Sequence, residues 1–176
     1  MRKARIAQLA GIAAAVPMLV LATTGSAYAD GYGIKWASNE TQDCLAWTND
    51  NGNWTLGTVK PAFPGSGSSY CVDDNHQIEW DDTQGNLENQ DGSYWRESPG
   101  GHDDMCLTAY GTGGGLGQAY LEPCSSPANY YEQWKEQWTG SGFNLVNRET
   151  GYCLDSNSSF EVYTLPCNGG QYQLWH

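Results

Sequence analysis

The sequence is poor in basic residues, with 8 Lys and Arg against 20 Asp and Glu among 176 residues. Three of the 8 basic residues lie before residue 30, where there is no acidic residue, so the remaining chain carries a net charge of −15. Such a surface repels phosphate backbones and anionic lipid headgroups, which argues against nucleic acid and bare membrane as partners. A neutral sugar or a basic protein is compatible with this charge.

The sequence also lacks the motifs of common catalytic and metal sites. No Gly-x-Ser-x-Gly motif occurs, and none of the three His residues lies in a Ser or Cys nucleophile motif. There is no Cys-x-x-Cys pair for zinc, and acidic pairs such as Asp81-Asp82 lack the Asp-x-Asp-x-Asp-Gly spacing of a calcium loop. We therefore expect no catalytic residue, no metal and no cofactor, and we expect the acidic pairs to lie in solvated turns.

A long apolar run occurs only at the N-terminus. Basic residues precede an apolar segment over residues 6–22, and Ala27-Tyr28-Ala29 supplies the small residues of a signal peptidase site. This pattern predicts a secretory signal peptide over residues 1–29. No later run approaches the roughly 18 apolar residues of a membrane helix, so we expect residues 30–176 to form one secreted, extracellular domain without a membrane span.

The mature chain contains three copies of one cysteine-marked unit, at about residues 34–92, 93–142 and 143–176. Each copy has an apolar lead residue, a Cys-Leu pair, a second cysteine, and then a Gln followed by a Trp. In chain order, the leads are Trp36, Trp95 and Leu145, the Cys-Leu pairs are Cys44-Leu45, Cys106-Leu107 and Cys153-Leu154, the second cysteines are Cys71, Cys124 and Cys167, and the last two residues are Gln77 and Trp80, Gln133 and Trp134, and Gln173 and Trp175.

The repeat also selects a disulfide pairing. The six cysteines are an even number in an exported chain, where disulfides are the default, but six cysteines allow 15 pairings. Pairing within each unit gives Cys44–Cys71, Cys106–Cys124 and Cys153–Cys167.

The secondary-structure signal predicts an all-β fold. With 22 Gly in the chain, no mature segment sustains an amphipathic helix period, whereas short strand-like runs recur at residues 34–36, 94–96, 143–146 and 161–165. Residues 47–69 and 81–92 of the first unit are rich in turn residues or lack periodicity, so we expect surface loops there. Three repeats of about four short strands predict a pseudo-threefold barrel closed by hairpins, with the repeated Leu and Trp residues in one shared core.

At these residues the chain resembles the ricin B-type lectins, also called QxW-repeat β-trefoils. The third unit carries the motif most completely, as Cys153-Leu154-Asp155, then Cys167-Asn168-Gly169, then Gln173-Leu174-Trp175. The resemblance covers the whole mature chain, and the chain is similar to small stand-alone trefoil proteins secreted by actinobacteria. It implies a β-trefoil that binds glycan or polysaccharide in shallow pockets, up to one per unit.

The chain departs from this family at the pocket positions. The sugar-binding Asp of the family falls at Ala46, Thr108 and Asp155, and the stacking ring falls at Ser69, Glu122 and Leu165. Tyr163, and Tyr120 in the second unit, could replace the missing ring. The resemblance therefore implies at most one family-like sugar site, formed by Asp155, Tyr163, Tyr172 and Gln173.

Two further functions fit the same sequence. The first-unit loops, with Trp47 and Trp54, could form the contact surface of a secreted protein-binding module, such as an inhibitor or a toxin-complex component. A glycoside hydrolase would need two carboxylates facing each other across a cleft. Glu122, Glu132, Glu136 and Asp155 are available for such a pair, but nothing in the sequence brings two of them together.

Overall fold

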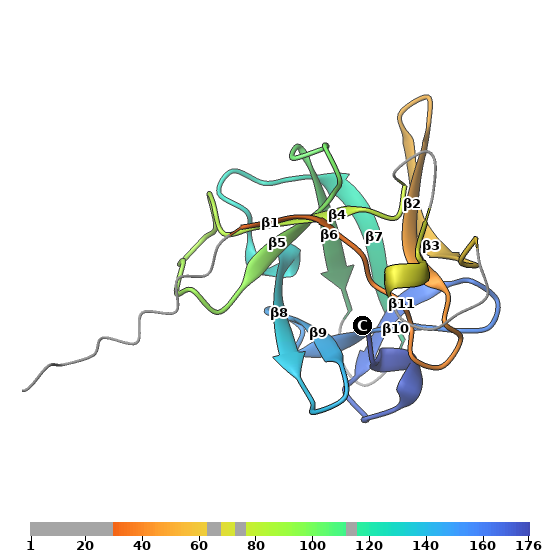
Figure 1. Cartoon of the computed structure of the whole chain (residues 1–176). Helices are drawn as coiled ribbons and strands as arrows, with labels where there is room; N and C mark the ends of the chain where they lie inside the picture. Colours follow the sequence, from red (N-terminus) through yellow and green to blue (C-terminus); the bar gives the residue numbers. More distant parts are fainter. Residues whose placement is uncertain (1–29, 63–67, 73–76, 112–115) are drawn as a thin grey trace, which may run out of the picture.

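The computed structural model describes residues 30–62, 68–72, 77–111 and 116–176 (Figure 1). The predicted signal peptide, residues 1–29, lies outside this part of the chain. The strands of the first repeat are β1 (Gly31–Ile34), β2 (Cys44–Asp50), β3 (Asn53–Val59) and β4 (Trp80–Thr83), those of the second are β5 (Trp95–Pro99), β6 (Met105–Tyr110), β7 (Gly117–Pro123) and β8 (Gln133–Trp138), and those of the third are β9 (Phe143–Asn147), β10 (Tyr152–Ser156) and β11 (Val162–Pro166). Short 3-10 turns form at Ser68–Tyr70, Tyr130–Glu132 and Gln171–Gln173.

The described residues form no α-helix, which confirms the all-β prediction. None of them belongs to a helix that could cross a membrane. Nine strands form one sheet in the order β1-β4-β5-β8-β9-β10-β11-β7-β6, and β2 and β3 form a separate two-stranded hairpin.

Each repeat contributes one hairpin and part of a barrel wall, which is formed by β1 and β4, by β5 and β8, and by β9 with the bridges of Trp175. The hairpins are β2–β3, β6–β7 and β10–β11. The wall closes where Trp175, near the end of the chain, bridges to Ser38 on one side and to Phe143 on the other. The first and last repeats therefore meet along the wall, as a pseudo-threefold barrel requires.

The core repeats the same contact three times. Leu45, Leu107 and Leu154 are fully buried, and so are Trp80, Trp134 and Trp175. In each repeat the indole Nε1 donates a hydrogen bond to the backbone oxygen of the Leu, over 3.2, 2.7 and 3.1 Å in chain order. The Trp thereby buries its ring without leaving its polar N–H unsatisfied. This contact confirms that the repeated Leu and Trp residues share one core.

The three disulfides join the cysteines of each repeat: Cys44–Cys71, Cys106–Cys124 and Cys153–Cys167. The pairing selected by the repeat is thus confirmed. No described cysteine is free.

The first repeat differs from its prediction in two segments. Much of 47–69 was expected to be loop, but Cys44–Asp50 and Asn53–Val59 pair over seven residues as β2 and β3. Asn51 and Gly52 connect them with φ angles of 54° and 88°, the geometry of a tight hairpin turn in which Gly carries no strain.

The second difference concerns Asp81 and Asp82, which were expected in a solvated turn. Both are buried in β4, which pairs with β5. The Asp81 carboxylate accepts hydrogen bonds from the backbone N–H groups of Gly33 and Gly101, at 3.0 and 2.9 Å. Asp81 is therefore a buried acceptor that ties β1 and the loop after β5 to β4.

Candidate functional site

The hairpin β10–β11 brings three of the four predicted sugar-site residues together. Asp155 and Tyr163 are directly opposite each other in the ladder, and because alternate residues share a face, both lie on the face opposite Leu154. The third residue, Gln173, follows in the 3-10 turn and reaches Asp155 from the side. The Tyr163 hydroxyl also donates to the backbone oxygen of Ser156 at 3.1 Å.

The charge state of Asp155 follows from this enclosure. The side chain is 4% exposed, and burial raises its pKa, while hydrogen bonds from Gln173, Tyr163 and the Ser156 backbone partly offset the rise. Burial, followed by the negative charge of Asp155, raises the pKa of Tyr163. Asp155 is thus a nearly enclosed carboxylate beside Tyr163, whose hydroxyl is held by the Ser156 backbone oxygen.

Gln173 and Tyr172 play different parts from those predicted. Gln173 is fully buried, its Oε1 accepts from the Asn168 N–H at 2.9 Å, and its Nε2 donates to the Pro166 backbone oxygen at 3.3 Å. These bonds commit most of the amide to holding the loop. Tyr172 is half-buried, and its backbone oxygen accepts from Ser156 Oγ at 3.5 Å.

The equivalent positions in the other repeats lack this pair. In the second repeat Tyr120 lies opposite Thr108, which is buried and donates to its own strand at the Cys106 oxygen. In the first repeat Ala46 lies opposite Gly57, where a side chain would start 3.0 Å from the Phe160 backbone oxygen. The carboxylate–tyrosine pair therefore occurs in the third repeat, where Asp155 and Tyr163 are cross-strand partners.

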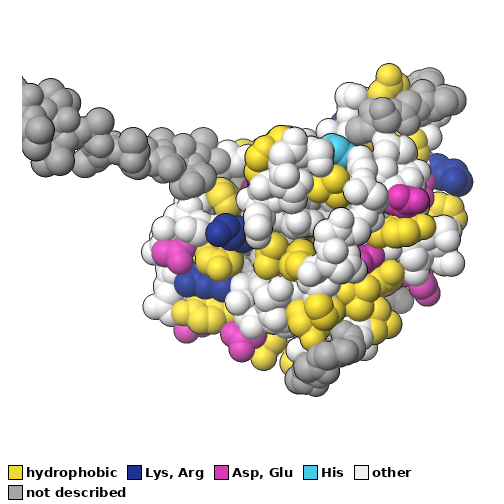
Figure 2. Space-filling model, turned by 90° about the horizontal axis from the view of Figure 1, so that it is seen from below, with side chains coloured by type: hydrophobic (Ala, Val, Ile, Leu, Met, Phe, Trp, Pro, Cys, Tyr) yellow, Lys and Arg dark blue, Asp and Glu magenta, His cyan; other side chains and the backbone are white. Residues whose placement is uncertain are grey.

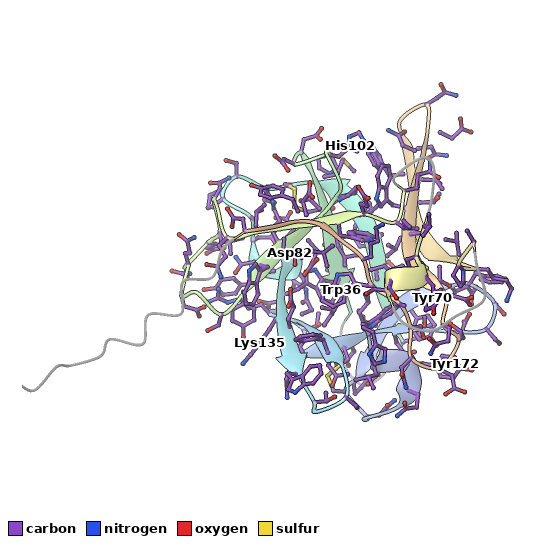
Figure 3. The ribbon with its side chains drawn as sticks, in the orientation of Figure 1. Trp36, Tyr70, Asp82, His102, Lys135 and Tyr172 are labelled. Carbon is purple, nitrogen blue, oxygen red and sulfur yellow. A yellow bond between two sulfur atoms is a disulfide. The ribbon has the colours of Figure 1, made fainter. Side chains whose placement is uncertain are left out.

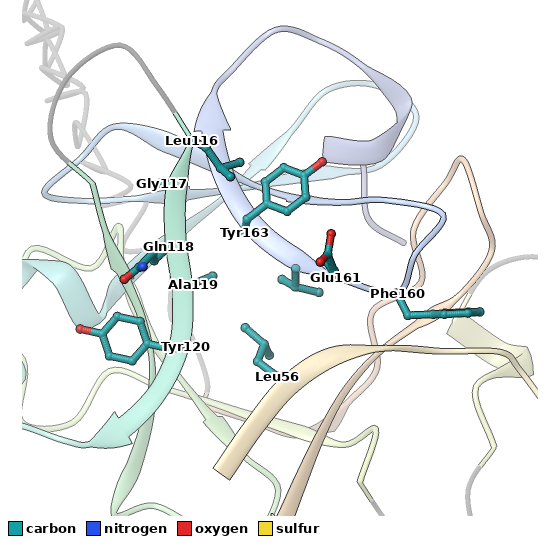
Figure 4. Close-up of a pocket in the computed structure, with 10 residues that line it drawn as sticks. Leu56, Leu116, Gly117, Gln118, Ala119, Tyr120, Phe160, Glu161 and Tyr163 are labelled. Carbon is teal, nitrogen blue, oxygen red and sulfur yellow. The ribbon is translucent and has the colours of Figure 1, made fainter. Parts of the chain in front are cut away.

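A pocket of about 570 Å³ opens where the three hairpins meet (Figure 4). Its walls come from β3, from β7 and from the loop and first residues of β11. The lining contains apolar groups, aromatic rings and two polar side chains. It includes Leu56, Leu116, Tyr120, Phe160, Tyr163, Gln118 and Glu161. No local sequence pattern indicates this pocket, because residues from three repeats form it.

The pocket combines rings and hydrogen-bonding groups in the way that a small polar ligand requires. Tyr163 stands between Leu116 and Glu161 in Figure 4, and its hydroxyl is directed at the Ser156 backbone oxygen. The Glu161 carboxylate is exposed and accepts from Asn157 Nδ2 at 2.7 Å, which fixes one of its oxygens. Tyr163 is therefore the residue that joins the pocket to the enclosed Asp155.

The aromatic residues of the first repeat pack on one another. Trp47 is 6% exposed, and its indole Nε1 donates to the Glu79 backbone oxygen at 3.0 Å. The Trp54 ring lies 5.6 Å from that of Trp47, and His102 meets both rings edge-on at 4.9–5.2 Å. This cluster packs along the β2–β3 hairpin, and its burial leaves Trp47 unavailable to a partner.

No protein-family model matches this chain. Solved structures share its fold, however. The designed threefold-symmetric protein ThreeFoil is 18% identical with a TM-score of 0.55, over 82% of this chain and 94% of that one. SeviL, solved with asialo-GM1 saccharide bound, is 12% identical with a TM-score of 0.53, over 82% and 95%.

A Caenorhabditis elegans protein of unknown function is also similar, at 12% identity and a TM-score of 0.56 over 86% of this chain and 96% of that one. At these identities the similarity establishes the fold alone. The chain is a β-trefoil with pseudo-threefold symmetry and three disulfide-stapled repeats.

Proposed function

We propose that this chain is a secreted, lectin-like carbohydrate-binding protein of the ricin B type, which binds a neutral glycan or polysaccharide through its third repeat. The observation that carries the proposal is the position of Tyr163. Its ring lines the 570 Å³ pocket, and it is also the cross-strand partner of Asp155, the one carboxylate at the family's sugar-binding position.

The chemistry of the pocket supports a sugar. A pyranose offers an apolar face to a tyrosine ring and hydroxyl groups to carboxylate and amide side chains. Tyr163 supplies the ring, Glu161 the exposed acceptor, and Gln118 both a donor and an acceptor. Asp155 acts by orienting Tyr163, because its own carboxylate is enclosed.

Secretion is supported by the disulfides and by the sequence of the leader. Three disulfides are characteristic of proteins that fold in an oxidising compartment. The face in Figure 2 carries many apolar and uncharged polar groups and few charged ones, which suits a neutral partner. One neighbour of the same fold, SeviL, was solved with a saccharide bound.

A glycan array followed by calorimetry tests the proposal. Wild type should bind at least one glycan or polysaccharide, and Tyr163→Ala should weaken that binding at least about tenfold, the scale of losing one aromatic anchor. Tyr32→Ala is the matched control, because Tyr32 is 68% exposed on β1, outside the pocket lining. Both variants must keep the wild-type unfolding midpoint within a few degrees for the comparison to count.

Failure to bind any glycan or polysaccharide would overturn the lectin proposal, as would equal binding by Tyr163→Ala. The protein-binding alternative would then gain weight if one basic secreted protein bound specifically. We also propose that the protein is not an enzyme, and release of reducing sugar from a polysaccharide panel would contradict this. Loss of that release on mutating Glu161 would place a glycoside hydrolase site in the pocket.

A further inference from the structure

Three carboxylates meet inside the barrel wall, away from the hairpin pocket. Asp82 on β4, Glu97 on β5 and Glu136 on β8 each bring an oxygen within 4.8 Å of the other two. Asp82 and Glu97 are directly opposite each other in the ladder. Figure 3 shows Asp82 and Trp36 toward the middle of the molecule, on the inner side of these strands.

The pseudo-threefold symmetry shows how unusual this cluster is. In the β8–β9 pair, Glu136 lies opposite Leu145. In the equivalent β4–β5 pair, Asp82 lies opposite Glu97, so Glu97 occupies the position that Leu145 has in the third repeat. The sequence repeat assigned the apolar lead of the second unit to Trp95, but in the structure Trp95 is half-buried and Glu97 occupies the buried position. One layer of the barrel therefore contains an acidic residue, Glu97, where its symmetry mate is a leucine.

The two inner members of the cluster are deeply buried and lack compensating groups. Glu97 is 1% exposed and Asp82 is 2% exposed. Within the described part of the chain, neither oxygen of Glu97 nor Oδ1 of Asp82 has a hydrogen-bond partner. The indole Nε1 of Trp36 is directed at Glu97, but it also falls short of a hydrogen bond.

No basic side chain of the described residues forms an ion pair with the three carboxylates. Lys35, Lys60 and Arg148 pair instead with Glu79, Asp43 and Asp91. Burial therefore disfavours the charged forms strongly. Burial and the neighbouring Glu97 raise the pKa of Asp82 to about 10, and burial raises the pKa of Glu136 to about 8. A positive charge placed among the three would relieve this cost.

We propose that Asp82, Glu97 and Glu136 form a binding site for a hard divalent cation, with Ca²⁺ as the best fit. All donors in the cluster are carboxylate oxygens, which Ca²⁺ prefers to nitrogen or sulfur ligands. Two oxygens on one Ca²⁺, each at 2.3–2.6 Å, are at most about 5 Å apart, and the cluster meets this limit. Glu136 is partly exposed, which leaves the solvent side open for entry and for water ligands.

Thermal unfolding of the metal-free protein with and without 10 mM CaCl₂ tests this proposal. A site of the affinity usual in extracellular modules, about 0.1–1 mM, should raise the unfolding midpoint by about 3–10 °C. Tb³⁺ is a second probe, because its luminescence is sensitised by a nearby indole such as Trp36. Glu97→Leu introduces the residue found at the equivalent position 145 and fills the layer with an apolar side chain. Because it removes a carboxylate ligand, it should abolish both the Ca²⁺-dependent rise of the unfolding midpoint and the sensitised Tb³⁺ luminescence.

Two further variants separate this site from general attraction to an acidic protein. Glu149→Gln removes an exposed acid elsewhere and should leave the Ca²⁺ response unchanged. Glu136→Gln keeps the size of the side chain and should weaken the response by at least about tenfold in Ca²⁺ concentration. An unchanged midpoint in wild type, or an equal shift in Glu97→Leu, would overturn the proposal and leave the cluster holding protons only.

Discussion

The buried carboxylates of the barrel predict that the metal-free protein loses stability as the pH rises through neutrality. Carboxyl groups of the unfolded chain ionise near pH 4, whereas burial raises the pKa of Glu97 to about 7 in the folded state. Between these values the folded protein retains a proton that the unfolded chain has lost. The contribution of Glu97 to the free energy of unfolding is therefore fully present below pH 4. This contribution falls as the pH rises toward 7, and it is lost above the folded pKa.

The magnitude follows from the number of protons. Each proton held by the folded state alone lowers the free energy of unfolding by about 1.4 kcal/mol per pH unit. With a folded pKa of about 7, the proton on Glu97 gives a loss of about 2 kcal/mol from pH 5 to pH 7, because this proton is half dissociated at pH 7. Protons retained on Asp82 and Glu136 would add to this loss. Because these groups are coupled, we take the one-proton value as the minimum.

Urea unfolding at pH 5, 6 and 7, in EDTA and at constant ionic strength, measures this slope. Burial also raises the pKa of Asp155, which adds a slope of the same sign in every variant. The difference between wild type and Glu97→Leu therefore isolates the barrel cluster, and the variant should have the flatter profile. A wild-type stability that stays constant or rises from pH 5 to pH 7 would refute the reasoning, as would equal slopes in the two proteins.

Three other changes test the fold and the asymmetry of the site. Replacing both Cys153 and Cys167 by Ser opens a loop of 14 residues and should cost about 3 kcal/mol of unfolding free energy in urea. Leu107→Ala removes a fully buried core side chain and should cost about 2–5 kcal/mol by the same measurement. Thr108→Asp places a carboxylate opposite Tyr120, as Asp155 lies opposite Tyr163. Because Tyr120 and Tyr163 line the same pocket, calorimetry should show a changed glycan affinity with the wild-type stoichiometry, and a second equivalent of bound glycan would show that the two rings serve separate sites.

The fold was predictable because its determinants recur in register along the chain. Each Cys-Leu pair places the Leu in the core and the Cys on the opposite face, and each later Trp returns to the same Leu. Three agreeing copies reveal a pattern that one copy would not. The hairpin of the first repeat also had a local signal, Asn51-Gly52 between two strand-like runs, but the surrounding polar residues suggested a loop.

The pocket and the acidic cluster were not predictable in the same way. Asp82 and Glu136 are 54 positions apart in the numbering, and the barrel ladder is what brings them together. The apparent pair Asp81-Asp82 was misleading, since neighbours on a strand face opposite sides and the two carboxylates serve different contacts. The pocket likewise depends on where three hairpins meet, which no local pattern records.

The two departures from threefold symmetry lie on different parts of the molecule and are energetically separable. At the hairpins, the third repeat has Asp155 where the others have Ala46 and Thr108, next to the pocket. In the barrel, the second repeat has Glu97 where the third has Leu145.

Burying an unpaired carboxylate costs several kcal/mol, a cost that the disulfides and the repeated core can offset without any ligand. Because the two sites share no residue, Glu97→Leu should remove the Ca²⁺ response yet leave glycan binding intact, and Tyr163→Ala should do the reverse. A protein in which either variant abolished both responses would have one coupled site rather than two.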